Sequence, residues 1–342
     1  MSLNQQEQEM LARLRARLLQ GHRTLKEEYG APAKGTPTGP GDAFVIDAAT
    51  RESMLNQDPQ SAAVLKPYVA GRDIDKWQFG QPSRWLVHLP AGKMNVDDYP
   101  AVRQYLETHR AELEKRPGHQ KWYELDGEYA SESDTEVQPK IIFFQDAGRP
   151  AFALDRSGAH FAHSGFSLPH EDYYLLGVLN SKLQRFLIQS QVEESGVEAG
   201  VQQAHLEVLP FPVPLLEHKT MIGSTSHFCV KLAGERDGFH AHMHQEIAQH
   251  LAPGGAASEL SERLLGWHLL DIVSFQEEVR RHFGAAIAQD MLPSWDGLLR
   301  EAKQQLSIID ADMWRAEQQI DRCMYEMFEL SEEEIELLNS RY

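Results

Sequence analysis

From about Trp295 to Phe328 the chain repeats apolar residues every three or four positions, which places them on one face of a single long helix. Residues 260–275 carry a second apolar stripe with the same spacing. A last short helix is expected after Ser331, because serine caps helix N-termini well. These patterns predict a C-terminal helical domain at residues 259–342.

Residues 30–215 have a different pattern, in which short apolar segments alternate with Gly- and Pro-rich turns. Strands are expected at 43–46, 84–89, 140–144 and 151–154, and helices at 47–56, 100–115 and 173–191. The strand at 140–144 is apolar throughout, which is typical of a strand buried on both faces. The sequence therefore predicts an α/β (α+β) fold: a small, mainly antiparallel sheet flanked by helices, then a C-terminal helical region.

Two further segments complete the expected organisation. Residues 1–29 are interpreted as an N-terminal helix and linker, with the helix at 5–28. Residues 216–258 are rich in Gly and His, and they predict an irregular linker with a weak strand at 227–232.

The charge of the chain restricts how it can bind a polyanion. Lys and Arg number 33 against 51 Asp and Glu, a formal net charge of −18. Phosphate contacts need cations, so a net negative charge argues against DNA binding by the surface in general. Residues 251–342 have 8 Lys and Arg against 18 Asp and Glu, whereas residues 30–190 have 17 against 21. Acidity is thus concentrated at the C-terminus, and a locally basic face is permitted elsewhere in the chain.

The expected cellular compartment follows from the absence of membrane and secretion signals in the sequence and from its few cysteines. No apolar run of about 18 residues is present, so no membrane span or membrane partner is expected. The polar N-terminus does not resemble a secretory signal. Two scattered cysteines, Cys229 and Cys323, are typical of reduced thiols in a cytoplasmic protein.

The familiar catalytic motifs are missing. The sequence has no Walker-type phosphate loop, no Gly-x-Ser-x-Gly elbow and no His-Glu-x-x-His pair. Neither an Asn-Pro-Pro-Tyr stretch nor a Pro-Asp…Asp/Glu-x-Lys nuclease pattern occurs. We therefore expect no catalytic residue, cofactor site or metal site in this chain.

The segment 240–244, His-Ala-His-Met-His, is the one pattern that imitates a metal site. Alternate histidines share one face of a strand, and the first and last are neighbours on a helix. No acidic or Cys ligand stands at a characteristic spacing, so a polar surface segment is preferred to a metal-dependent hydrolase.

Four groups of segments, in order, carry a family resemblance. They are KGTPTGPGDAFVID (34–47), LKPYVAGRDI (65–74), KWYEL (121–125) with QPKIIF (138–143), and YYLLGVLNSKL (173–183) with LPFP (209–212). Together they resemble the TaqI-like C-terminal specificity domain, the target-recognition part of type IIG restriction–modification enzymes and related adenine-N6 DNA methyltransferases. The resemblance covers roughly residues 30–215, and residues 323–335 resemble the tail of those enzymes.

The resemblance implies a function in sequence-specific DNA recognition. The chain would direct adenine-N6 methylation and cleavage by methyltransferase and nuclease domains of a parent enzyme, which would use S-adenosylmethionine and Mg²⁺. Double-stranded DNA and those catalytic domains are the expected partners. One departure is the stretch 200–205, where relatives tend to carry Arg and Lys and this chain offers only His205.

Several polar and aromatic residues in these segments suit contacts with bases or phosphates. The candidate DNA-binding residues are Lys34, Thr36, Thr38, Arg72, Lys76, Lys121, Trp122, Lys140 and Lys182.

Structural explanations compete with each of them. Arg72 and Asp73 can form an internal salt bridge, Trp122 can belong to the core, and Lys140 can merely begin a buried strand. Asn180, beside the candidate Lys182, is interpreted as a hydrogen-bonding residue at a helix–loop junction rather than a base reader.

A protein-interaction module is the alternative function. A long acidic helix with an apolar stripe suits packing against a partner helix. We expect residues 259–342 to brace the reading domain against the catalytic part of the parent enzyme.

Overall fold

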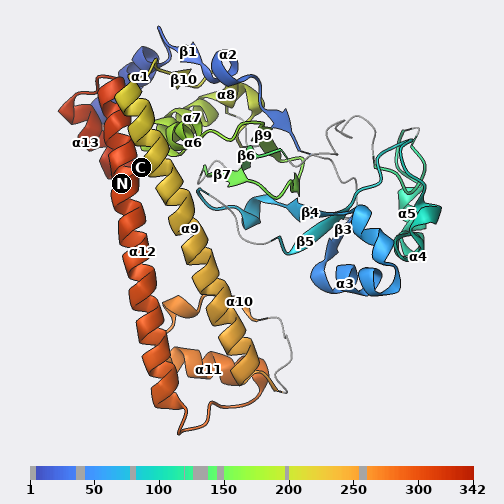
Figure 1. Ribbon diagram of the computed structural model, residues 1–342. Helices are drawn as coiled ribbons and strands as arrows, with labels where there is room; N and C mark the ends of the chain where they lie inside the picture. The colour runs from blue at the N-terminus through green and yellow to red at the C-terminus, as the bar shows by residue number, and fades with distance from the viewer. Residues whose placement is uncertain are drawn as a thin grey trace. The chain divides into compact units, whose positions relative to one another are not determined.

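The structure is a computed structural model that describes residues 5–35, 43–77, 82–118, 120–125, 138–144, 150–196, 200–253 and 260–342 (Figure 1). The chain divides into two compact units: unit 1 is Met1–Ser226 with Gln319–Tyr342, and unit 2 is His227–Gln318. Small sheets flanked by helices, followed by a helical C-terminal region, confirm the predicted α+β fold class. No helix among the described residues is long and apolar enough to cross a lipid bilayer.

One sheet of unit 1 has the strand order β3-β5-β4-β8. Its strands are β3 (Val45–Asp47), β5 (Arg84–Val87), β4 (Leu65–Val69) and β8 (His160–Phe161). All pairs are antiparallel except β4 with β8, which is parallel. Strand β8 begins about ninety residues after its neighbour β4 ends, so this sheet joins segments that are distant in the sequence.

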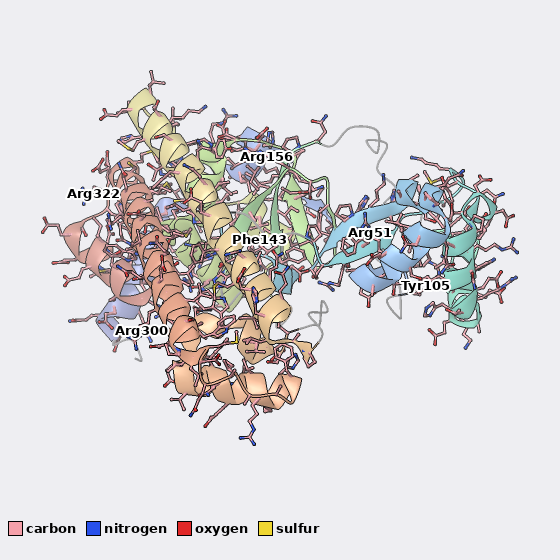
Figure 2. The ribbon with its side chains drawn as sticks, turned by 60° about the horizontal axis from the view of Figure 1, so that its bottom comes forward. Arg51, Tyr105, Phe143, Arg156, Arg300 and Arg322 are labelled. Atoms are coloured by element: carbon pink, nitrogen blue, oxygen red, sulfur yellow. The ribbon has the colours of Figure 1, made fainter. Side chains whose placement is uncertain are left out.

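Helices and short 3-10 turns pack beside this first sheet, and side-chain caps fix where several of them begin. They are α3 (Ala48–Gln57), α4 (Pro100–Thr108) and α5 (Arg110–Leu113), with 3-10 turns η1 (Pro59–Ala63) and η3 (Val96–Asp98). Asp47 accepts a 2.7 Å hydrogen bond from Thr50 N and so caps α3. Figure 2 shows Arg51 on α3 and Tyr105 on α4 beside the sheet. The helix predicted at 100–115 is divided at His109 into α4 and α5.

The second sheet of unit 1 has the strand order β2-β9-β6-β7 and is wholly antiparallel. Its strands are β2 (Ala33–Lys34), β9 (Gly165–Leu168), β6 (Lys140–Phe144) and β7 (Phe152–Asp155). After Lys140, every residue of β6 is buried, which confirms the prediction for this strand. Phe143 stacks on Phe152 of β7 with ring centroids 4.5 Å apart (Figure 2).

Two helices, α6 (Tyr173–Asn180) and α7 (Lys182–Ser195), follow the second sheet, where one helix was predicted. The break lies at Ser181, whose hydroxyl accepts from Gln184 N at 3.3 Å and caps α7. Asn180 is buried, and its side chain pairs with the backbone of Phe152 in β7. That contact confirms the interpretation of Asn180 as a hydrogen-bonding residue and fastens α6 to the sheet.

The N-terminal segment is also divided. It forms α1 (Gln5–Leu18), β1 (Arg23–Thr24) and α2 (Leu25–Tyr29) instead of one helix at 5–28. Thr24 and Glu27 form a capping box that starts α2 afresh. Strand β1 pairs with β10 (Pro210–Phe211), which follows α8 (Gln203–Glu207), so the N-terminal segment pairs with the C-terminal end of the predicted recognition domain.

Residues 216–251 correct a prediction. The sequence predicts an irregular linker at 216–258 with a strand at 227–232, but the structure has one helix, α9 (Leu216–Leu251). Both predictions are wrong for the described part of that segment. A buried stripe explains the helix, because its apolar residues repeat at helical spacing between the glycines: Ile222, Cys229, Val230, Leu232, Ala233, Met243 and Ile247. The side chains of Cys229 and Cys323 are both buried, and neither belongs to a disulfide.

Unit 2 holds part of α9 and part of α12 (Leu292–Met327), joined by α10 (Glu262–Leu265), the 3-10 turn η6 (Trp267–Leu269) and α11 (Ile272–Phe283). Its separate core centres on the fully buried Trp267 and Phe275. The prediction of a long helix from 295 to 328 is confirmed by α12. A last helix, α13 (Glu332–Arg341), lies in unit 1 and is capped by Ser331 as predicted.

Candidate nucleic-acid interface

The two sheets of unit 1 meet at a pair of aromatic side chains. Phe144 ends β6 and Phe161 lies in β8, with their rings edge to face and their centroids 6.4 Å apart. Val69, Ile142 and Ala159 complete this small buried cluster. We call the place where these strands end the sheet junction.

Three chain segments are tied together at the sheet junction by backbone hydrogen bonds. Gly35 N donates to Gly165 O at 3.0 Å, and Gly165 N donates to Ala162 O at 2.8 Å. Ala162 N in turn donates to Val69 O at 3.1 Å. The exits of β2 and β4 and the turn between β8 and β9 therefore have fixed backbones at one place.

Two glycines permit this close approach. A Cβ atom on Gly165 would lie 2.8 Å from Phe161 Cδ2, and one on Gly35 would overlap the Ala162 carbonyl oxygen. Larger residues would push the segments apart. Gly71, at the start of the 3-10 turn η2 (Gly71–Asp73), lies against Phe144. The turn that carries Arg72 thus belongs to the same junction as Lys34.

Two of the predicted DNA-binding residues, Lys34 and Arg72, lie on segments that meet at this junction. Lys34 is exposed in β2, opposite Phe166 of β9. Thr36 and Thr38 lie outside the described residues, as does the side chain of Arg72. The structure therefore brings the Lys34 and Arg72 segments together, although they are far apart in the sequence.

The turn η2 is held by Asp73. Its carboxylate accepts from Ala70 N at 2.8 Å and forms a salt bridge with Arg84 of β5. Asp73 therefore has Arg84 as a salt-bridge partner, whereas the predicted pair of Arg72 with Asp73 lies outside the described side chains. A 3-10 turn fixed in this way presents the Arg72 position on a rigid backbone.

Lys76 precedes a second anchor, Trp77. Trp77 is fully buried, and its backbone pairs with β7 through two hydrogen bonds of 3.0 Å, to Phe152 O and from Leu154 N. Its φ of 79° is in the left-handed region, which a bulky residue adopts only where its surroundings impose it. The segment from η2 to Trp77 is therefore fastened at both ends, with the partly buried Lys76 beside the second anchor.

Lys121 and Trp122 lie elsewhere, next to α5. Tyr123 is buried, and the Trp122 ring packs perpendicular to it, with the Arg110 guanidinium 4.9 Å from the indole centroid. Trp122 thus packs at the edge of the core instead of presenting an open stacking platform. Lys121 is 62% exposed, and hydrogen bonding to Tyr123 and the nearby Glu124 carboxylate raise its pKa above the ordinary value. Of the two residues, Lys121 is the one that a ligand can reach.

Lys140 has an internal partner. Its ammonium nitrogen lies 3.3 Å from a carboxylate oxygen of Asp155, which is completely buried. Asp155 also accepts from Ser157 N at 2.7 Å and from Ala159 N at 3.0 Å. The Lys140–Asp155 pair therefore shapes the turn between β7 and β8, in agreement with the structural interpretation of Lys140.

Lys182 also faces the protein. Its ammonium donates to Asn339 Oδ1 at 2.9 Å and lies 3.7 Å from Asp321. Its backbone N–H donates to the same aspartate at 2.8 Å. Lys182 thus joins α7 to the C-terminal helices within unit 1, away from the segments that carry Lys34 and Arg72.

The turn between β8 and β9 is a part of the junction that sequence reasoning missed. His163 and Ser164 are exposed at its tip, immediately before Gly165. The short stretch Ala-His-Ser-Gly between two apolar segments was a usable turn signal. Nearby, burial lowers the pKa of His160 to about 3, with His88, Lys140 and Lys66 adding positive potential. His160 is therefore neutral at physiological pH and supplies no charge to a phosphate.

The stretch before the Pro-rich exit offers no cation either. His205 lies at α8, and its Nδ1 accepts a hydrogen bond from Gln202 N at 3.1 Å. Burial lowers the pKa of His205 below its usual value. His205 is therefore charged less readily than an ordinary histidine, as expected of a stretch without Lys or Arg.

The histidines at 240–244 lie on a helix. The rings of His240 and His244 are 6.1 Å apart, and His244 Nε2 lies 2.9 Å from Leu265 O. Burial lowers the pKa of His240 to about 4, helped by His268 and His244. Within the described ranges, no three His, Cys, Asp or Glu side chains are grouped to hold a metal ion.

Two segments of the chain match models of protein families. Residues 66–211 match the family of the TaqI-like C-terminal specificity domain, and residues 216–324 match a domain of unknown function, DUF8810. No curated protein matches the sequence.

Among solved structures, the fold is similar to that of the Type IIL restriction-modification enzyme MmeI, solved in complex with DNA. The TM-score is 0.53 at 11% sequence identity, and the similarity covers 92% of this chain and 35% of the MmeI chain. The present chain thus spans about a third of that enzyme, and at this identity the likeness is one of fold. The family match, over residues 66–211, confirms for that part of the chain the resemblance to the TaqI-like C-terminal specificity domain.

Proposed function

We propose that this chain recognises a specific DNA sequence, as the specificity module of a restriction–modification enzyme. The observation that carries the proposal is the family match over residues 66–211, joined to the convergence of the Lys34 and Arg72 segments at the sheet junction. The fold likeness to MmeI supports it, since that enzyme was solved with DNA.

The sheet junction suits sequence reading for a physical reason. Strands and paired glycines fix the backbone, while side chains at the tips remain able to vary. Lys34, Arg72 and the exposed turn residues His163 and Ser164 supply donors for base edges or phosphates. Lys76, near the junction, and Lys121, next to α5, would contact phosphates of the DNA backbone.

The proposal extends to the activity of the parent enzyme. The module would select the site at which an adenine is flipped out and methylated, and would direct cleavage at a related site. S-adenosylmethionine and Mg²⁺ would serve methyltransferase and nuclease domains outside this chain's recognition module. Chemistry of that kind is not assigned to any residue of the sheet junction.

Selection from a randomised duplex pool tests the proposal. We expect the purified chain to enrich one short motif at moderate salt. Lys34→Ala and Arg72→Ala should weaken binding to that motif by about tenfold each, because a good base or phosphate contact contributes roughly 1–3 kcal/mol. Lys182→Ala is the matched control, since Lys182 faces the C-terminal helices. Absence of any DNA binding at low salt would overturn the proposed function.

Protein binding is a second candidate function for the helical region. Residues 251–342 have 18 Asp and Glu against 8 Lys and Arg, a balance that disfavours DNA. A bracing role towards catalytic domains is compatible with DNA reading, because the two functions use different residues. Binding of a methyltransferase partner should then survive Lys34→Ala and Arg72→Ala unchanged.

A further inference from the structure

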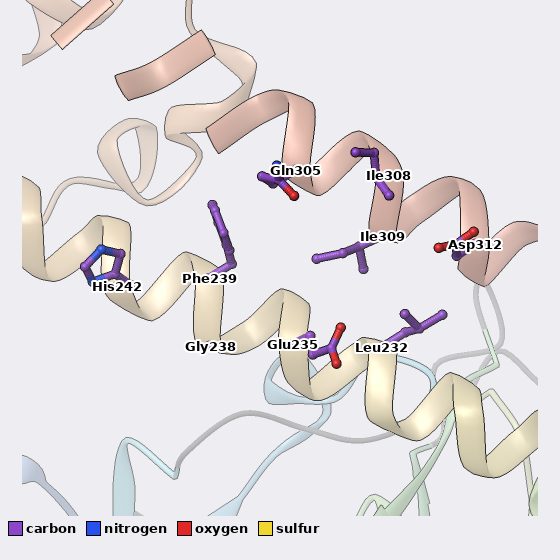
Figure 3. A pocket seen from close by; sticks show the side chains of 9 residues that line it. All are labelled: Leu232, Glu235, Gly238, Phe239, His242, Gln305, Ile308, Ile309 and Asp312. Carbon is purple, nitrogen blue, oxygen red and sulfur yellow. The ribbon is translucent and has the colours of Figure 1, made fainter. Parts of the chain in front are cut away.

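Unit 2 contains an open groove between α9 and α12. Its volume is about 600 Å³. Figure 3 shows Phe239 and Ile309 projecting between the two helices, with Glu235, Leu232 and Asp312 towards one end and His242 towards the other. The groove is open along its length, so it can admit an elongated ligand.

The walls repeat at helical spacing. On α9 the lining side chains stand at positions i, i+3, i+7 and i+10, and on α12 at i, i+3, i+4 and i+7; they are Leu232, Glu235, Phe239 and His242, and Gln305, Ile308, Ile309 and Asp312. Ten residues of α-helix span about 15 Å. The row on α12 is shorter, about 10 Å over seven residues. Two rows side by side, each longer than one helical turn, are the complement of a third helix laid into the groove.

Gly238 gives an independent indication of a close neighbour. It lies in the interior of α9, where glycine weakens a helix. Apart from its chain neighbours and the nearby backbone of its own helix, no described atom lies within 4 Å of the place where its Cβ would be, so no packing contact requires glycine there. A small residue on a groove wall lets another helix backbone approach closely.

The middle of the groove is apolar. Phe239 both lines it and packs against the core of unit 2, whereas Ile308 is 48% exposed. The groove therefore exposes to water an apolar surface that continues from the core of unit 2. An apolar side chain placed there would lose contact with water at little structural cost.

The net negative charge of unit 2 restricts which ligands can bind in the groove. Residues 227–318 have 8 Lys and Arg against 14 Asp and Glu. Glu235 and Asp312 lie on the same side of the apolar centre, and their salt-bridge partners, Lys231 at 3.6 Å and Arg315 at 3.0 Å, lie on their own helices. Such exposed pairs within a helix are weak, so an incoming cation can compete for these carboxylates. This charge disfavours DNA and a second copy of the same acidic unit.

We propose that the groove between α9 and α12 binds an amphipathic helix of a partner protein, with its apolar face on Phe239, Ile308 and Ile309 and a Lys or Arg beside Glu235 and Asp312. The proposal goes beyond DNA recognition and stands independently of it.

A designed peptide tests the proposal on the full chain. The probe is a labelled helical peptide of about 15 residues with Leu at i, i+4, i+7 and i+11 and Lys at one end. Its control is a peptide of the same composition in scrambled order. Fluorescence anisotropy should give at least about tenfold tighter binding for the patterned peptide. Equal binding of both peptides would show charge attraction alone and overturn the proposal.

Two variants localise the binding. Gly238→Leu fills the groove while favouring the helix, and Ile308→Asp changes an exposed side chain, so both proteins should fold. Each should weaken the patterned peptide by about tenfold or more. The matched controls, Gly297→Leu and Ser307→Asp, alter exposed positions of α12 that do not line the groove, and should change the affinity less than twofold.

Unchanged affinity in Gly238→Leu and Ile308→Asp would place the peptide elsewhere and overturn the proposal. Sedimentation tests the rival occupant. Self-association of the chain that Ile308→Asp abolishes would assign the groove to a second copy instead.

Discussion

Lys34 and Lys140 are both lysines of the second sheet, yet their surroundings differ. Lys34 is exposed beside the sheet junction, whereas the ammonium of Lys140 is paired with the buried Asp155. Lys140→Ala should lower the free energy of unfolding by about 1–3 kcal/mol, because it removes a charged partner of a buried carboxylate. Lys34→Ala should leave stability unchanged and reduce only DNA affinity.

Urea unfolding and DNA titration of both variants separate these roles. Lys140→Ala should unfold at lower urea with an unchanged slope, since the change affects stability and not compactness. Equal stability of Lys140→Ala and the wild type would show that Asp155 does not need this lysine.

His160 predicts a dependence of stability on pH. Burial lowers its folded-state pKa to about 3, whereas an unfolded histidine titrates near 6.5. Below about pH 6.5 the unfolded chain binds a proton that the folded chain refuses until about pH 3. The free energy of unfolding should therefore fall with decreasing pH across this window, by at most about 1.4 kcal/mol per pH unit from this group.

Comparison of the wild type with His160→Gln at pH 7 and pH 5 isolates that contribution. The variant should lose less stability than the wild type over the same interval, because it lacks the titrating group. His240 titrates in the same direction in unit 2 and remains in both proteins, so it cancels in the difference. Identical pH profiles would contradict the assignment to His160.

At the scale of elements, Asn180 shows how a helix end completes a sheet. Its side chain accepts from Phe152 N at 3.0 Å and donates to Phe152 O at 2.8 Å, as a neighbouring strand would. Asn180→Ala leaves two buried backbone groups of β7 without that partner, and should cost about 1–3 kcal/mol. Thermal unfolding beside Asn56→Ala, an exposed asparagine of α3, checks the effect. Equal melting temperatures would contradict this role.

The elements that the sequence predicts correctly are those with strong local signals. Asp47 and Ser331 cap α3 and α13, and the apolar run at 140–144 forms β6. The failure at α9 has a physical cause. Its glycines, serines and histidines have low helix propensity, and the helix is stabilised by burial against other elements, which a local pattern does not show.

The candidate site was predictable to a similar degree. The segments of Lys34 and Arg72 carry turn residues, and the structure joins them through the glycines of the sheet junction. Lys140 and Lys182 have no distinguishing local signal, because their partners Asp155 and Asp321 come from distant positions. Only the folded chain separates cations that face solvent from cations that neutralise buried carboxylates.

For the whole molecule, the net charge of −18 limits how DNA can be bound. Attraction must come from a small local group of cations, and we propose Lys34, Arg72, Lys76 and Lys121 as that group, because Lys140 and Lys182 neutralise carboxylates of the protein itself. Each phosphate contact contributes about −0.9 to the slope of log K against log salt. Four contacts therefore predict a slope no steeper than about −4.

Titrations of the selected duplex between about 50 and 200 mM salt measure this slope. A substitution to Ala at a residue that contacts phosphate should make the slope shallower by about 0.9 and weaken all sequences alike. A substitution at a residue that reads a base should leave the slope nearly unchanged and relax the motif at one position. A wild-type slope near −8 would contradict this account, because so many phosphate contacts would need cations beyond the sheet junction and Lys121.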